Sequence, residues 1–281
     1  MKPLFIISCP IDTYSGYGAR ARDVVKAIIE LKDSEYDIKI AAQRWGNCPW
    51  GFLEDHKEEW GFLIPYLLPK GNELPKQPEI WAQITVPNEF QPVGKYNIGF
   101  TAGIETTLCA PQWIEGLNRM DLNIVSSNHA KQVFENSKFE QHDSNTNQKI
   151  GVVELQKPIE VLFEGASLEK YFPSKNTNNL DLSQVKESFA YLFVGHWMQG
   201  VLGEDRKNVG LLVKLFYETF KNQKKTPALI LKCSGAGTSY IDRDEILKKI
   251  NQVKSTVQAD ILPNVYLLHG EFSDQEINDL Y

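Results

Sequence analysis

Short apolar runs alternate with helical apolar stripes along most of the chain. Runs that predict strands lie at residues 4–8, 37–42, 80–86, 96–101, 122–126 and 159–163, and again at 191–194, 228–233 and 265–268. Between them, apolar residues recur at helical spacing over 19–31, 111–120 and 130–136, then over 209–220, 243–257 and 274–281. Strands that alternate with amphipathic helices are typical of parallel sheets covered by helices. The pattern predicts an α/β fold with two Rossmann-like domains in tandem.

Polar and irregular stretches interrupt this pattern. Residues 174–183 contain several Asn and little that could pack. We place the domain junction just before or within them, with an N-terminal domain over 1–173 and a C-terminal domain over 184–281. Residues 137–149 are also polar and predict a mobile loop, whereas residues 45–79, rich in Trp, Pro and Gly, predict an irregular insertion.

Composition narrows the class of protein. The 281 residues suffice for two domains, and 42% hydrophobic with 23% charged residues exclude a disordered chain. The net charge of −6 argues against a nucleic-acid partner, although a local basic patch leaves room for peripheral membrane contact. Four scattered cysteines without a CxxC pair indicate free thiols in a reducing compartment. With no signal-peptide pattern and no apolar run of about 18 residues, we expect a cytoplasmic protein without a transmembrane segment.

The clearest candidate chemistry is a pair of adjacent cations, Arg206 and Lys207. They follow the predicted strand at 191–194, which we expect Gly195 to end, and they precede a helix that begins near Val209. In α/β proteins, phosphate binds outside the carboxyl end of a strand, near a helix N-terminus. A solvated basic loop is the alternative. Because this segment opens the second strand-loop-helix series, we favour a phosphate site.

Glycines follow two further strands. Gly16 and Gly18 come after the first strand as a GxG, without the third glycine of the full dinucleotide fingerprint, and Ser234, Gly235 and Gly237 follow the strand at 228–233. Small residues allow a backbone to approach a ligand, although a tight turn also explains a GxG. Three glycine-bearing loops after three strands favour phosphate.

With these motifs the chain resembles the retaining GT-B glycosyltransferases, family 4 in type. Residues 159–166, IEVLFEGA, with the Tyr-Phe-Pro of 171–173, resemble the family's crossover signature. The Phe-Val-Gly of 193–195 with Arg206-Lys207 resembles its phosphate motif, and residues 265–281 resemble its following strand and helix. The resemblance covers nearly the whole chain. It implies a GT-B fold, with an acceptor-side N-terminal domain and a donor-binding C-terminal domain.

The resemblance also implies an activity. A sugar would move with retention from a nucleotide sugar (UDP-, GDP- or ADP-sugar) to a sugar, glycan, lipid or small-molecule acceptor, with no obligatory metal ion or other cofactor. Arg206 and Lys207 would stabilise the charge that develops on the departing β-phosphate. Gly195 and the glycine loops would approach the nucleotide, and Gly270 and Glu271 would lie by the nucleobase.

Other side chains have two interpretations. Glu105, after the strand at 96–101, could polarise the acceptor hydroxyl, or it could be a capping or solvated carboxylate. Tryptophans gather in or beside the irregular insertion, where they could stack on acceptor sugars or simply pack: Trp45, Trp50, Trp60 and Trp81.

The chain departs from the family pattern at several positions. His196 replaces the usual phosphate-facing Arg, where a protonated imidazole could bind the phosphate instead. Asn208 replaces the usual Gly, and residues 197–205 lengthen the loop. The family's paired glutamates and final helices would follow Tyr281, so we expect a C-terminally truncated chain with an incomplete second domain. A non-catalytic nucleotide- or glycan-binding fragment and a GT-B-shaped sugar-nucleotide epimerase stay open as alternatives.

Overall fold

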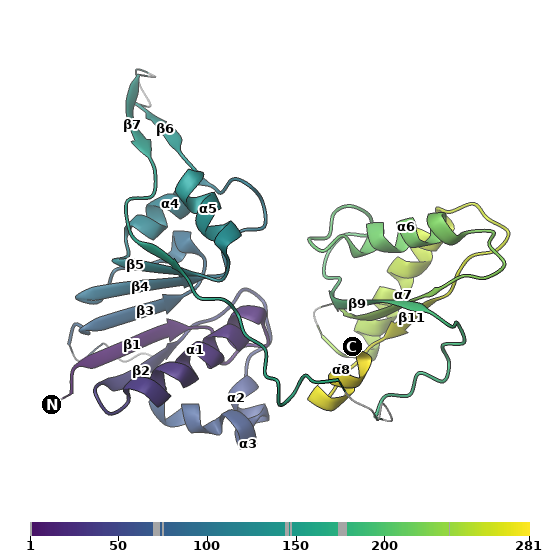
Figure 1. Ribbon diagram of the computed structural model, residues 1–281, viewed down its shortest axis with the longest axis horizontal. Coiled ribbons are helices and arrows are strands. Elements are labelled where there is room, and N and C mark those ends of the chain that lie inside the picture. The colour runs from purple at the N-terminus through teal and green to yellow at the C-terminus, as the bar shows by residue number, and fades with distance from the viewer. Residues whose placement is uncertain are drawn as a thin grey trace. The chain divides into compact units, whose positions relative to one another are not determined.

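The chain folds as two compact units, Met1–Gly165 and Ala166–Tyr281. The computed structural model describes residues 2–69, 74, 76–143, 146, 148–173, 179–235 and 237–281. The boundary between the units, after Gly165, comes earlier in the chain than the predicted junction at 174–183. Residues 174–178 of that junction lie outside the described part of the chain. Each unit is built on a parallel sheet with helices (Figure 1), which confirms the predicted α/β class.

Six parallel strands form the main sheet of the first unit, in the order β2-β1-β3-β4-β5-β8. Their bounds are β1 Leu4–Cys9, β2 Asp37–Ala42, β3 Ile80–Ile84, β4 Tyr96–Thr101, β5 Leu122–Val125 and β8 Ile159–Val161. The helices are α1 Gly16–Lys32, α4 Pro111–Asn118 and α5 Asn128–Asn136, with the short elements α2 Phe52–Asp55, α3 Lys57–Trp60, η1 Gly61–Tyr66 and η2 Pro87–Glu89. Because β2 and β3 flank β1, the topological switch point lies between β1 and β3, where ligands bind in such sheets.

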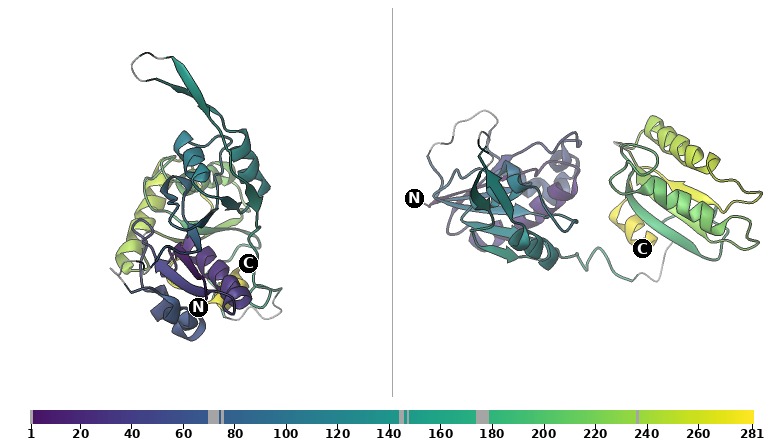
Figure 2. Two further views of the ribbon diagram at one scale, coloured as in Figure 1. Left: turned by 90° about the vertical axis from the view of Figure 1, so that its left-hand side faces the viewer. Right: turned by 90° about the horizontal axis from the view of Figure 1, so that it is seen from above.

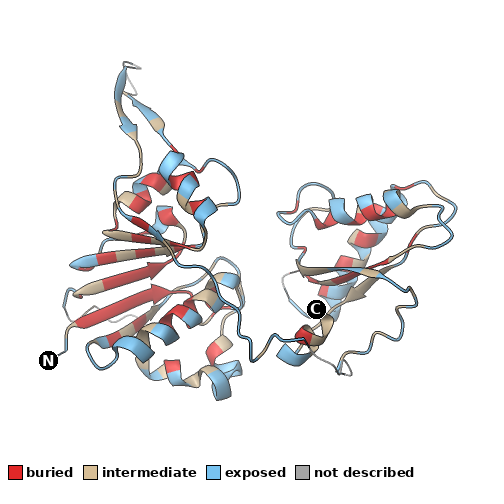
Figure 3. Cartoon of the chain, viewed as in Figure 1, coloured by how far each residue is buried: buried red, intermediate tan, exposed pale blue. Residues whose placement is uncertain are grey.

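Both faces of this sheet are buried, as the colouring of β1 shows (Figure 3). Leu4 and Ile6 belong to a core that includes α4 and α5, whereas Phe5 and Ile7 belong to a second core that includes α1. Successive side chains of a strand point to opposite faces. Helices on both faces therefore explain why this strand reads as a continuous apolar run.

Helix α1 begins three residues before the predicted start. Gly16 and Gly18 therefore lie in its first turn, and neither has a positive φ. Ser15 caps the helix, because its Oγ accepts a hydrogen bond from the Gly18 amide at 2.9 Å. The tight-turn explanation of this GxG is wrong.

The predicted mobile loop at 137–149 is wrong for half of its described residues, which lie in strands. β6 Phe139–His142 and β7 Lys149–Val153 form an antiparallel hairpin that projects from the first unit (Figures 1 and 2). Lys149 and Glu140 form an ion pair across it at 2.7 Å. Phe139 pairs with Val153 at its base, and both pack against the core that includes α4 and α5. The remaining residues are mostly polar, so composition alone does not identify the hairpin. Residues 144, 145 and 147, and residues 70–73 and 75 of the irregular insertion, lie outside the described part.

Three parallel strands form the sheet of the second unit, in the order β11-β10-β9. The elements are β9 Ala190–His196, β10 Ala228–Ser234, β11 Val265–Leu268, α6 Val209–Phe220, α7 Tyr240–Ser255 and α8 Asp274–Leu280. Leu229, Leu231 and Cys233 of the central strand form the core with α6 and α7. Gly195 lies inside β9, so the prediction that it ends the strand is wrong.

Helix α6 confirms the predicted helix, but only part of its predicted stripe is buried. The buried residues include Val209 and Phe216, whereas Leu211, Leu212 and Leu215 are exposed. The apolar run therefore covers more of the helix circumference than the core requires.

Candidate functional site

The carboxyl ends of the three strands of the second unit meet at one edge of its sheet. Gly195 of β9 pairs in register with Cys233 of β10, and His196 pairs with Ser234. Leu268, the last residue of β11, pairs in register with Lys232 of β10. Parallel register therefore brings together the segments that carry the predicted residues after β9, β10 and β11.

Lys207 lies against the end of β9. A Cβ placed on Gly195 would come within 3.2 Å of the Lys207 Cδ and 3.0 Å of the Phe193 Cζ. The glycine thus leaves space for the aliphatic part of the lysine. Arg206 and Lys207 are both exposed. This end of β9 therefore carries two cations next to the start of α6.

The segment before α6 is held closely against the helix. The buried Asp205 accepts a hydrogen bond from the Val209 amide through Oδ2 at 2.6 Å. Asn208 has a left-handed φ of 52°, and a Cβ on Gly210 would lie only 1.5 Å from the Val201 carbonyl oxygen. The residues that lengthen the loop, 197–205, therefore pack on α6. They fix the position of Arg206 and Lys207 before the start of this helix.

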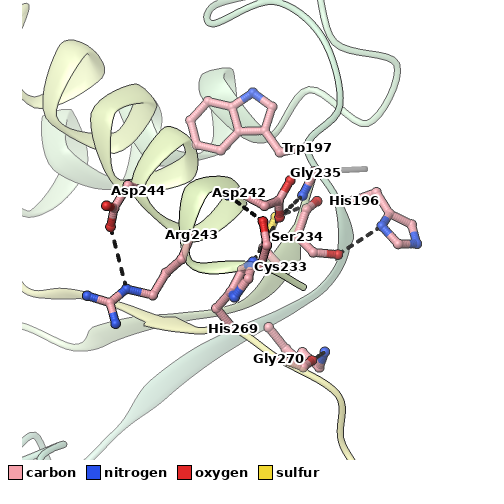
Figure 4. Close-up of polar contacts among 12 residues, drawn as sticks. His196, Trp197, Cys233, Ser234, Gly235, Asp242, Arg243, Asp244, His269 and Gly270 are labelled. Atoms are coloured by element: carbon pink, nitrogen blue, oxygen red, sulfur yellow. Dashed lines mark hydrogen bonds and ion pairs between the residues drawn. The ribbon is translucent and has the colours of Figure 1, made fainter. Parts of the chain in front are cut away.

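His196 is oriented by the neighbouring strand. Its Nδ1 lies 3.1 Å from the Ser234 Oγ, and the residue is exposed. Figure 4 shows the imidazole turned away from the buried contacts behind it. Because Nδ1 is engaged, Nε2 is the nitrogen that a ligand would meet.

Behind the β10 end, a buried carboxylate joins two segments. Asp242 Oδ2 accepts hydrogen bonds from the Gly235 amide at 2.9 Å and from His269 Nε2 at 2.8 Å (Figure 4). The Gly237 amide also donates to this carboxylate. Although burial raises the pKa of Asp242, the bonds from His269, Gly235 and Gly237 outweigh it and bring the pKa below its ordinary 3.8.

Sequence reasoning missed Asp242. The one available signal is its place as the third residue of α7, after the Ser239 cap, which is the position of the acidic residue in a capping box. The local pattern does not indicate that the carboxylate reaches His269, 27 residues further on.

The segment after β11 has its own constraint. Gly270 has a φ of 126°, a conformation that side chains rarely adopt. Its carbonyl accepts a hydrogen bond from Lys232 Nζ at 2.8 Å, and that ammonium lies 4.5 Å from the centre of the Phe272 ring. Burial lowers the pKa of Lys232, and Glu271 partly opposes this shift. The hydrogen bond from Lys232 thus holds Gly270, and with it Glu271, against β10. These are the two residues predicted to lie by the nucleobase.

The remaining predicted residues belong to the first unit. Tyr17 of α1 joins the end of β4, because its hydroxyl lies 3.0 Å from the Thr101 Oγ1 and accepts from the Ala102 amide. Trp45 stacks on the Tyr17 ring at 4.1 Å between centroids. Burial raises the pKa of Tyr17, and the nearby carboxylates of Glu105 and Glu164 raise it as well.

Gly18 is required by packing. A Cβ at this position would come within 2.4 Å of the Thr13 carbonyl oxygen, whereas Gly16 has nothing within 4 Å. Arg22, whose pKa burial lowers to about 10, donates to the same Thr13 carbonyl at 3.1 Å. Its guanidinium lies 3.4 Å from the centre of the Phe52 ring. Gly16 alone of the pair borders open space.

The tryptophans divide between packing and partial exposure. Trp81 is buried in the core, and Trp60 packs against the core that includes α1. Trp45 and Trp50 are half-buried, and Arg44 lies over the Trp50 ring. Packing is thus established for two of the four.

Among the described residues, no group of three or more His, Cys, Asp or Glu side chains is placed to hold a metal ion. Within the same residues, no helix combines the length and apolar character needed to cross a membrane.

Comparison with protein-family models and with curated proteins gives no match. Among solved structures, the chain is similar to OtsA in its apo form, with a TM-score of 0.48 and 11% identity over 99% of this chain and 76% of that one. It is also similar to a trehalose-6-phosphate synthase studied with bisubstrate glycomimetics for glycosyl transfer with retention, with a TM-score of 0.44 and 10% identity over 98% and 75%. Likeness at this level assigns neither a family nor an activity.

Proposed function

We propose that the protein is a retaining GT-B glycosyltransferase that moves a sugar from a nucleotide-sugar donor to an acceptor. The observation that carries the proposal is the edge of the second unit, where Gly195 leaves space for Lys207 and the Arg206–Lys207 pair precedes α6. Cations beside a strand end and a helix start are suited to a diphosphate. The order of the sequence motifs supports the same class.

In this proposal the second unit binds the donor. As the sugar–oxygen bond breaks, negative charge grows on the β-phosphate of the leaving nucleoside diphosphate. Arg206 and Lys207 stabilise that charge, and His196 offers Nε2 as a further donor. These groups supply the stabilisation that a metal ion supplies elsewhere, so the reaction has no obligatory metal requirement.

The first unit binds the acceptor in this proposal. Tyr17, Trp45 and Glu105 border the end of β4 and the start of α1, within one unit. Stacked aromatic rings provide an apolar face for a sugar, and a carboxylate can polarise an acceptor hydroxyl. Gly16, which borders open space, permits close approach of the α1 backbone.

The test is donor turnover. The protein is incubated with UDP-, GDP- and ADP-sugars and a panel of simple sugars, and nucleoside diphosphate release and product configuration are followed by NMR. We expect one donor to give product with its anomeric configuration retained, and Lys207→Ala to slow turnover at least tenfold. Lys225→Ala, which removes an exposed lysine beyond the other end of α6, is the matched control and should leave the rate unchanged. Inversion, or equal rates for the two variants, would contradict the proposal.

A further inference from the structure

The amides of Gly235 and Gly237 are already occupied within the protein. The Gly235 amide donates to the carboxylate of Asp242, which lies behind it on α7 (Figure 4). The Gly237 amide also hydrogen-bonds this carboxylate. A backbone amide has one hydrogen to donate. A Cβ on Gly235 would come within 2.4 Å of the Asp242 Oδ1, so the carboxylate also explains why a glycine stands there. The amides of these glycines therefore bind the Asp242 carboxylate within the protein, whether or not a ligand is present.

Asp242 is itself tied to the next strand. His269, directly after β11, donates Nε2–H to the same Oδ2 that the Gly235 amide uses. The imidazole is 5% exposed and the carboxylate 11% exposed. Because buried charged hydrogen bonds are short and directional, this arrangement fixes the ends of β10 and β11 relative to each other.

Charge is divided along the edge. The end of β9 carries the cations Arg206 and Lys207, whereas the ends of β10 and β11 have one ammonium, Lys232, beside the carboxylates of Glu271 and of Asp242 from α7. A diphosphate is therefore attracted more strongly to the first region than to the second. The uncharged part of a nucleotide, its nucleoside, has no such preference and meets no repulsion beside the glycines.

We propose that Asp242 is a positioning residue that shapes Gly235 and Gly237 into the wall facing the nucleoside of the donor. This inference rests on the proposed function and adds the orientation of the nucleotide, with its diphosphate at the β9 end and its nucleoside over β10 and β11. Asp242 acts through the glycines and His269.

The test compares Asp242→Asn with Asp244→Asn, an exposed carboxylate two residues further along α7. Calorimetry measures the affinity of each full-length variant for UDP, GDP and ADP, and separately for inorganic pyrophosphate. We expect Asp242→Asn to weaken nucleoside diphosphate binding about tenfold and to change pyrophosphate binding less than twofold. Asp244→Asn should match the wild type with both probes. If the asparagine variant does not fold, His269→Gln, which keeps a donor to Asp242, should weaken nucleotide binding about threefold with the same selectivity.

Two results would overturn the inference. Unchanged nucleotide affinity in Asp242→Asn would show that the carboxylate shapes nothing that the ligand meets. Equal weakening of nucleotide and pyrophosphate would show a general structural role. Failure of the proposed function differs from both, because the wild type would then bind none of the three nucleotides. The exchange rates of the Gly235 and Gly237 amides, read by NMR, should rise at least tenfold in Asp242→Asn, and unchanged rates would refute the arrangement itself.

Discussion

Gly18→Ala tests whether the first glycine motif is explained by packing. The new Cβ would lie 2.4 Å from the Thr13 carbonyl oxygen, whereas ordinary contact begins at 3.4 Å, so the turn must retreat by about 1 Å. A shift of that size breaks or lengthens the 3.1 Å bond that Arg22 donates to the same carbonyl. Overpacking costs roughly 2 kcal/mol and the lost bond from a charged group about 2 more, while the higher helix propensity of Ala returns about 1. We expect a net loss of about 3 kcal/mol.

The assay is differential scanning calorimetry of Gly18→Ala against Gly16→Ala. For a unit of this size, about 3 kcal/mol corresponds to a fall in Tm of roughly 6–12 °C. Gly16 has nothing within 4 Å, so Gly16→Ala should leave Tm unchanged or raise it slightly. Equal Tm values for the two variants would refute the packing argument. If Gly16 serves a ligand, its variant should lose turnover while keeping its Tm.

Other consequences concern the second unit. Gly210→Ala should destabilise it by about 3 kcal/mol or more in denaturant unfolding, because its Cβ would meet the Val201 carbonyl oxygen at 1.5 Å; an unchanged midpoint would contradict the packing of the 197–205 segment on α6. Asp205→Ala should cost about 1 kcal/mol through loss of the Val209 cap, and a stability equal to that of the wild type would rule out this cap. Because the folded pKa of Asp242 lies below 3.8, its stabilisation is complete above that pH and is lost as pH falls through the folded value. The stability advantage of wild type over Asp242→Asn should therefore shrink below pH 3.8. An advantage that grows on acidification would contradict the predicted direction of this pH dependence.

The sequence pattern predicted the elements well where burial decides them. β1 is apolar throughout because helices cover both faces, and β2 and β11 match their predicted limits. The pattern failed where local periodicity carries no information about partners. The β6–β7 hairpin has one apolar pair, Phe139 with Val153, at its base, and the rest of its sequence is mostly polar. The exposed leucines of α6 look the same in sequence as the buried face.

The site was predictable only in part. Arg206 and Lys207 could be proposed from the sequence because adjacent cations between a strand and a helix suit a phosphate, and the structure places them between β9 and α6. The space that Gly195 leaves for Lys207, and the clash that makes Gly18 necessary, depend on distances that appear only in the folded chain. Asp242 could not be found, since its partner His269 is distant in sequence and ordinary in its local context.

The central claim is that the end of β9 binds the diphosphate of a nucleotide. It is tested most directly by titrating UDP, GDP and ADP into the wild type, Lys207→Ala and Lys225→Ala in a calorimeter. A charged hydrogen bond of about 1.5–3 kcal/mol predicts at least a tenfold weaker Kd for Lys207→Ala, with Lys225→Ala equal to the wild type. Absence of binding by all three nucleotides, or equal affinity in Lys207→Ala, would contradict the claim.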